Sequence, residues 1–167
     1  MGKTASILIC FLVLLPASSA GADQLQDGMD AYFKGKNTLA ISLLRPLAEQ
    51  GHADAQYHLG VMYQRGQGLK QDYTQAALWY RKAAQQGNTM AQAGLSNLYV
   101  TGRGVSQNYV LGYMWINLAA ALHPTDERSD KITALRDSIA DLLTPALLTE
   151  ARILSRDWFD KIQQLRD

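Results

Sequence analysis

The chain has 167 residues, of which 47% are hydrophobic, and its 16 Lys and Arg side chains nearly balance 15 Asp and Glu, for a formal net charge of +1. A charge this close to zero argues against nucleic acid or an anionic membrane surface as a partner held by electrostatics. The sequence contains one cysteine, Cys10. No internal disulfide can form, so the fold must be stabilised by packing.

Residues 1–22 have the pattern of a secretory signal peptide. Lys3 gives a basic start, residues 7–15 form an unbroken apolar run, and small residues follow, which predicts cleavage after Ala20 or Ala22. The alternative is an uncleaved anchor, but the apolar run is far shorter than the roughly 20 residues that a spanning helix needs. We therefore expect bacterial export and a periplasmic or secreted protein, with no stable membrane insertion after cleavage.

Cleavage would remove Lys3 and Cys10, leaving 15 basic and 15 acidic side chains and no cysteine. A lipoprotein is not expected, because Cys10 lies inside the apolar run and not at the small residues after it. About 145 residues would remain, which is enough for one domain with a core of its own.

Residues 23–52 predict a first, degenerate copy of a helix pair that recurs further along the chain. Apolar residues at helical spacing indicate its two helices: Leu25, Met29 and Tyr32, then Leu39, Leu43 and Leu47. Pro46 removes a backbone donor and should kink the second helix near its end.

Residues 53–88 and 89–123 repeat one another with a period of 36 residues. The shift superposes Ala55, Leu59, Tyr63, Gly66, Gly68 and Trp79 on Ala91, Leu95, Tyr99, Gly102, Gly104 and Trp115. A fixed period of roughly 20–50 residues is typical of stacked arrays, in which one unit cannot bury its own apolar face. The sequence therefore predicts two full structural repeats.

Each full repeat is expected to form a helix, a loop, a second helix and a turn. The expected helices cover residues 53–65, 73–86, 88–101 and 108–123. Gly66 should end the first of them in the left-handed conformation, and Asp72 and Asn108 should cap the second and fourth. Small residues mark the places where two helix axes approach closely: Gly60, Ala76, Ser96 and Gly112.

Residues 124–167 predict two further helices. Pro124 to Glu127 form a helix start with acidic residues in the first turn, and Thr144 and Pro145 mark a second start. We expect this pair to cover the open end of the array, as stacked repeats need.

No residue set in the sequence has the spacing of a catalytic or metal site. His52 and His58 are six residues apart, His123 lies at a helix end, and without a close carboxylate pair or a cysteine they predict no metal site. Asp54 and His58 are expected to form a surface pair. No serine lies in a Gly-x-Ser-x-Gly elbow, and the glycine turns lack the strand and third glycine of a dinucleotide-binding loop. We expect no catalytic residue, no cofactor and no metal.

Two runs resemble the signature of the Sel1-like repeat family, which is related to the tetratricopeptide repeats: AQYHLGVMYQRGQG from Ala55 and DYTQAALWYRKAAQQG from Asp72. The resemblance covers residues 53–121 closely and 28–51 loosely. It implies an all-α fold, a short right-handed α-solenoid of antiparallel helix pairs with a C-terminal capping helix pair.

The resemblance also implies a non-catalytic adaptor or regulator that binds another envelope or secreted protein on the concave face of the repeats. One alternative is an immunity or inhibitor protein that neutralises a secreted toxin or an envelope enzyme. An alternative of another class is a cell-envelope hydrolase, which would need acid, base or nucleophile groups converging in a pocket.

In tetratricopeptide-like arrays the first helices of successive repeats line the concave face, so their outward positions are the expected contact residues. Counting around the helix from Leu59 and Tyr63 gives Asp54, Tyr57, Val61, Gln64 and Arg65, and 36 residues later Met90, Ala93, Asn97, Val100 and Thr101. A mixture of aromatic, Met and Arg side chains with polar ones is typical of interface centres. The sequence therefore predicts a protein-binding stripe made of these two sets.

Overall fold

The computed structural model of the protein describes residues 17–122 and 127–164, and every regular element in these ranges is a helix. The helices are α1 (Ala17–Phe33), α2 (Asn37–Glu49), α3 (Ala53–Arg65), α4 (Tyr73–Gln85), α5 (Thr89–Thr101), α6 (Tyr109–Leu122), α7 (Glu127–Ala140) and α8 (Pro145–Gln164). The all-α prediction is confirmed, and the expected repeat helices differ from the observed ones by one residue at most at each end.

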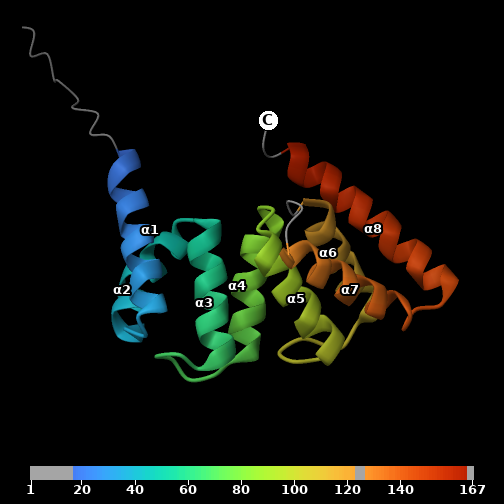
Figure 1. Ribbon diagram of the computed structural model, residues 1–167, viewed down its shortest axis with the longest axis horizontal. Helices are drawn as coiled ribbons and strands as arrows, with labels where there is room; N and C mark the ends of the chain where they lie inside the picture. Colours follow the sequence, from blue (N-terminus) through green and yellow to red (C-terminus); the bar gives the residue numbers. More distant parts are fainter. Residues whose placement is uncertain (1–16, 123–126, 165–167) are drawn as a thin grey trace, which may run out of the picture.

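Successive helices pair and stack into a short α-solenoid. α1 packs on α2, α3 on α4 and α5 on α6, and the pairs are joined where α2 packs on α3 and α4 on α5. The pairs follow one another along the long axis of the molecule (Figure 1). The predicted stacking of helix pairs is therefore confirmed.

The helix ends follow from a few residues with special backbone or side-chain chemistry. Gly66 and Gly102 end α3 and α5 with φ of 68° and 69°, a left-handed conformation that costs glycine little. Asp72 and Asn108 each accept a hydrogen bond from the backbone N–H three residues later, both at 2.9 Å. Pro46 lies inside α2, which continues to Glu49.

Small residues let the paired helices approach closely. A Cβ atom on Gly60 would lie 2.5 Å from a carbon of the Tyr80 ring, so α4 packs against bare backbone of α3 there. In the next pair, Ser96 Oγ donates to the carbonyl oxygen of Gly112 at 2.7 Å and joins α5 to α6. These positions are the close approaches that the sequence predicts.

The core runs along the array as three clusters of buried side chains. The first is centred on Leu44, Leu59 and Met62, the second on Tyr80, Leu95 and Leu98, and the third on Tyr113, Ile116 and Ile139. Tyr32 and Tyr63 pack against both the first and the second. Each repeat therefore shares its core with its neighbours and does not close one of its own.

The last two helices pack on the final repeat. Both α7 and α8 contact α6. The Trp115 and Trp158 rings lie 5.4 Å apart between centroids, and Ser155 Oγ donates to the Met114 carbonyl oxygen at 3.3 Å. The pair thus covers one end of the array (Figure 1). Residues 123–126, which include His123 and the expected helix start at Pro124, lie outside the described ranges.

α1 contains both positions at which the sequence predicts cleavage, Ala20 and Ala22. Two of its contacts with the rest of the array come from residues further along. Gln24 Nε2 donates to the Leu43 carbonyl oxygen of α2 at 3.0 Å, and Ala31 is buried in the core. Cleavage after Ala20 or after Ala22 would leave these two contacts in place.

Candidate protein-binding site

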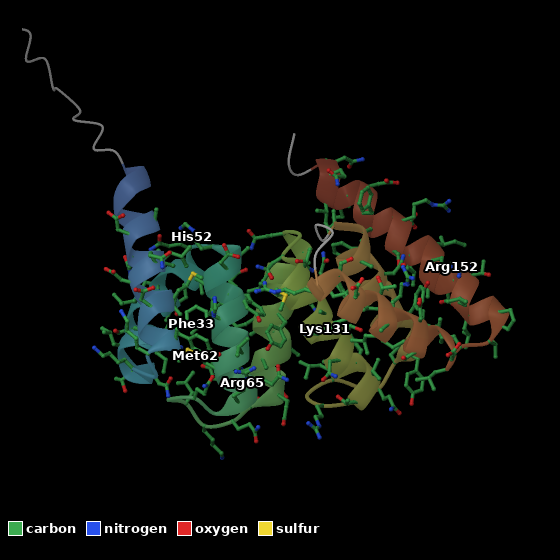
Figure 2. The ribbon with its side chains drawn as sticks, in the orientation of Figure 1. Phe33, His52, Met62, Arg65, Lys131 and Arg152 are labelled. Carbon is green, nitrogen blue, oxygen red and sulfur yellow. The ribbon has the colours of Figure 1, made fainter. Side chains whose placement is uncertain are left out.

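A hollow of about 590 Å³ opens on the side of the array formed by α1, α3 and the start of α5, with α7 at its far edge. We call it the α3 groove, because α3 contributes more of its lining than any other helix. The lining residues are Met29, Tyr32, Phe33, Asp54, Tyr57, His58, Val61, Arg65, Asn88, Met90 and Arg128. Figure 2 shows Phe33 beside α3 and Arg65 near the end of α3 that leads into the next loop.

Aromatic rings from α1 and α3 form one wall of the α3 groove. The His58 ring lies 5.2 Å from Tyr32, 6.1 Å from Phe33 and 5.1 Å from Tyr57 between centroids. Tyr57 in turn stacks on Tyr80 at 6.0 Å. Phe33 remains 71% exposed, so a large aromatic surface is open at this wall. Exposed aromatic surface of this kind is what interface centres use.

Polar contacts tie the walls of the groove together. Arg65 Nη1 of α3 donates to the Tyr32 hydroxyl of α1 at 3.3 Å, and Asn88 Nδ2 donates to Asp54 Oδ1 at 2.9 Å. The first bond links α3 to α1 of the pair before it, and the second links α3 to the start of the next repeat. The groove is therefore shaped by three successive repeats.

The Tyr57 hydroxyl lies in a charged setting. Burial raises the pKa of Tyr57, the neighbouring Tyr32 adds to the rise, and the guanidinium groups of Arg65 and Arg128 oppose it. Burial also raises the pKa of Tyr80 well above its usual range. Both hydroxyls therefore keep their protons near neutral pH and can donate hydrogen bonds.

His58 is buried, which corrects the expected surface pair with Asp54. Only 7% of His58 is exposed, because Tyr32 and Phe33 of α1 pack over the α3 surface that carries it. Burial lowers the pKa of His58, and the Asp54 carboxylate opposes that shift only in part. The ring is therefore mostly neutral at pH 7.

One ring nitrogen of His58 makes no hydrogen bond within the described residues. Its Nδ1 atom is buried and has no hydrogen-bond partner among the residues that the structure describes. A general base is oriented by one partner and positioned on a nucleophile by hydrogen bonding. Among residues 17–122 and 127–164 there is also no cluster of three or more His, Cys, Asp or Glu suited to a metal ion.

Half of the predicted stripe lies in the α3 groove. Asp54, Tyr57, Val61, Arg65 and Met90 line it. Val61, expected to be exposed, is 7% exposed and belongs to the core. Gln64 lies beside the groove, where its side-chain oxygen accepts a hydrogen bond from the Tyr80 hydroxyl at 2.5 Å.

The other half of the stripe lies outside the groove. Ala93 and Val100 pack against the buried cluster that α6, α7 and α8 share. Asn97 and Thr101 are exposed, and Thr101 Oγ1 donates to the Asn97 carbonyl oxygen at 2.8 Å. Helix periodicity puts these residues on one side of α5. It could not show that the C-terminal helices would cover part of that side.

The predicted stripe omits part of the groove lining, namely the residues of α1 together with His58, Asn88 and Arg128. The residues from α1 are Met29, Tyr32 and Phe33. The weak echo of the repeat in residues 23–52 was the available signal, since it places α1 directly before α3 in the stack. Arg128 had no comparable signal, because its position depends on how the chain returns after α6.

None of the helices in the described parts of the chain is long and apolar enough to cross a membrane.

Comparison with known proteins gives one repeat family and several structures. The Sel1 repeat family matches residues 53–88 and 89–123. The crystal structure of c5321, a protective antigen present in uropathogenic Escherichia coli strains that displays an SLR fold, is 31% identical, with a TM-score of 0.77 over 85% of this chain and 30% of that one. A Sel1 repeat protein from Oxalobacter formigenes is 33% identical, with a TM-score of 0.57 over 59% of this chain and 39% of that one. This chain thus spans well under half the length of either structure. No curated protein matches it.

Proposed function

Because the chain is a Sel1 repeat protein, we propose that it is an exported, non-catalytic module that binds a segment of another protein in the α3 groove. Sel1 repeats are generally protein–protein interaction modules. The observation that carries the proposal is the groove itself, where a largely exposed Phe33 adjoins partly buried tyrosine rings, the buried His58 ring and charged side chains. A central apolar surface with polar surroundings is the usual anatomy of a protein interface.

The state of His58 supports a binding role over a catalytic one. It is the histidine that lines the α3 groove, and its Nδ1 atom has no hydrogen-bond partner among the described residues. A hydrolase would use such a ring to activate a nucleophile, and neither a serine nor a carboxylate is bonded to that atom.

Residues 1–22 support the proposal of export, because their basic start, short apolar run and small residues follow the pattern of a cleavable leader. Mass spectrometry of the protein from fractionated cells should give a chain that begins at Gly21 or Asp23 in the periplasmic or secreted fraction. A full-length chain in the cytoplasmic fraction would contradict export and leave the binding proposal standing.

Site-specific photo-crosslinking tests the binding proposal. A photo-reactive phenylalanine analogue replaces Phe33 in the groove or, as the control, Leu78, which is an exposed apolar residue of α4 outside the groove lining. We expect a protein adduct in producing cells from position 33 and none of that mass from position 78. Equal adducts from both positions, or none from position 33, would overturn the proposal.

The identity of the adduct then separates the two roles that the sequence leaves open. One secreted enzyme, captured in a one-to-one ratio and inhibited by the purified protein, favours an inhibitor. Several envelope proteins that remain active favour an adaptor. In either case Tyr57→Ala and Arg65→Ala should reduce the adduct while circular dichroism shows unchanged helicity.

A further inference from the structure

The first helix pair, α1 and α2, forms the end of the array opposite to the end that α7 and α8 cover (Figure 1). Its outer surface contains a hollow of about 360 Å³. We call this surface the N-terminal end face. Its side chains are Asp27, Asp30 and Lys34 of α1, Lys36, and Leu39 and Leu43 of α2. No residue lines both this hollow and the α3 groove, so the two surfaces are separate.

The equivalent surface of each later helix pair is covered by the pair before it. Leu43 lies 36 residues before Trp79, and Trp79 lies 36 residues before Trp115. Trp79 of α4 is buried among residues of α1, α2 and α3, and Trp115 of α6 among residues of α3, α4 and α5. Leu43 is only partly buried, because the described part of the chain has no helix pair before α1. The N-terminal end face is thus the stacking surface of a repeat without its neighbour.

This surface is more apolar than the polar outer face that a terminal repeat needs for solubility. Leu39 is 48% exposed, and Leu43 lines the same hollow one helical turn further along α2. Residues at this spacing are neighbours on a helix surface, so the two leucines form a continuous apolar strip. An apolar strip bordered by charged side chains is the usual anatomy of a protein interface.

The charges of the N-terminal end face balance one another. Asp30 and Lys34 form an ion pair within α1 at 3.3 Å. The side chains of Asp27 and Lys36 are exposed, and neither makes a hydrogen bond or an ion pair with residues 17–122 or 127–164. A strongly acidic or basic partner would find no excess of opposite charge here. A surface with one free charge of each sign complements a second copy of itself turned about a two-fold axis.

We propose that the N-terminal end face binds the same face of a second copy of this chain and forms a two-fold symmetric dimer. Leu39 and Leu43 of the two copies pack together, and Asp27 of each copy pairs with Lys36 of the other. All four residues remain after cleavage at either predicted position. Helices as short as α2, at 13 residues or roughly 20 Å, give a small interface, so we expect dissociation in the micromolar range.

Analytical ultracentrifugation tests the dimer, with protein purified from the cells that produce it and a concentration series that spans the micromolar range. The mass should rise from one chain to two. Leu39→Glu should raise the dimer Kd about tenfold or more, because it replaces the apolar contact by two carboxylates that face each other. Glutamate suits the first turn of α2, and circular dichroism checks that helicity is kept. Leu78→Glu is the matched control, since Leu78 is 42% exposed on α4 outside this hollow.

A charge exchange tests the two-fold arrangement without changing any apolar contact. Asp27→Lys and Lys36→Glu each place like charges opposite one another, so each variant alone should dimerise more weakly than the wild-type protein. In an equal mixture of the two variants, every contact again joins opposite charges. The mixture should therefore form a mixed dimer with a Kd close to that of the wild-type protein, and added salt should weaken it.

Three results would overturn the proposal. The first is a single-chain mass at every concentration, and the second is a dimer that Leu39→Glu and Leu78→Glu affect equally. The third is a mixture of the charge variants that stays as weak as each variant alone, which would exclude the two-fold pairing. Masses that grow beyond two chains would also exclude it, because the face would then contact a different surface of the next copy. Phe33→Ala should leave the dimer unchanged, so this test is independent of binding in the α3 groove.

Discussion

Gln56 and Gln92 lie 36 residues apart and make the same buried hydrogen bond. Each Nε2 atom donates to the carbonyl oxygen eight residues earlier, at 3.0 Å to Ala48 and 3.1 Å to Ala84. Both acceptors lie near the end of the second helix of the preceding pair, and each also accepts from the backbone N–H three residues later, Gly51 at 3.1 Å and Gly87 at 3.0 Å. The first helix of each full repeat is thus hydrogen-bonded to the repeat before it.

Replacing Gln92 by leucine should destabilise the protein by about 1 kcal/mol, the net contribution of one hydrogen bond, because the Ala84 carbonyl oxygen loses its side-chain donor but still accepts from the Gly87 N–H at 3.0 Å. Gln56→Leu should cost more, since Gln56 Oε1 also accepts from Gln86 Nε2 at 2.8 Å. Urea unfolding followed by circular dichroism measures both changes. Gln164→Leu on the exposed surface of α8 is the control, and equal losses at all three positions would contradict the role given to this bond.

Gly60→Ala should destabilise the protein by about 1–3 kcal/mol through overpacking. The added Cβ atom would lie 2.5 Å from the Tyr80 ring, and that ring is held on its other edge by Gly94, where a Cβ atom would lie 2.9 Å away. Gly21→Ala, which meets nothing within 4 Å, is the control in the full-length chain. The thermal midpoint reports the difference. A midpoint for Gly60→Ala no lower than that of Gly21→Ala would show that α3 and α4 can separate freely.

The free energy of unfolding should decrease as the pH falls, because His58 is buried in the folded protein. Burial lowers the pKa of His58 in the folded protein, so the unfolded chain binds a proton first as the pH falls. The contribution of neutral, buried His58 to the free energy of unfolding is therefore complete above the pKa of the unfolded chain, about 6.5. It declines as the pH falls from there towards the lower pKa of His58 in the folded protein.

Urea unfolding at a series of pH values tests this dependence. His58→Gln should flatten the dependence of the free energy of unfolding on pH below about 6.5. The same slope in wild-type protein and His58→Gln would exclude His58 as its source.

Trp115→Ala should cost about 3–5 kcal/mol, because only 4% of Trp115 is exposed and its ring lies 5.4 Å from that of Trp158. Trp158 is only partly buried, so Trp158→Ala should cost less. Equilibrium unfolding gives both free energies. A larger loss for Trp158→Ala would mean that α8, and not the repeat, provides most of the stability at this end.

The sequence by itself determined the repeat architecture of this protein. The 36-residue period indicates equivalent units that stack on one another. The left-handed glycines Gly66 and Gly102 and the caps Asp72 and Asn108 are local signals, because each depends on the backbone conformation of a few neighbouring residues. Helix periodicity also placed Tyr57 and Arg65 on the outward side of α3, and both line the groove.

Only the tertiary structure decided the content of that groove. α1 covers His58 with Tyr32 and Phe33, and α7 brings Arg128 to the same hollow while the C-terminal cluster takes up Ala93 and Val100. These relationships depend on the docking of helices that are distant in sequence. The helical pattern of a sequence fixes which side chains lie on the same face of a helix, but it does not fix which later helix covers that face.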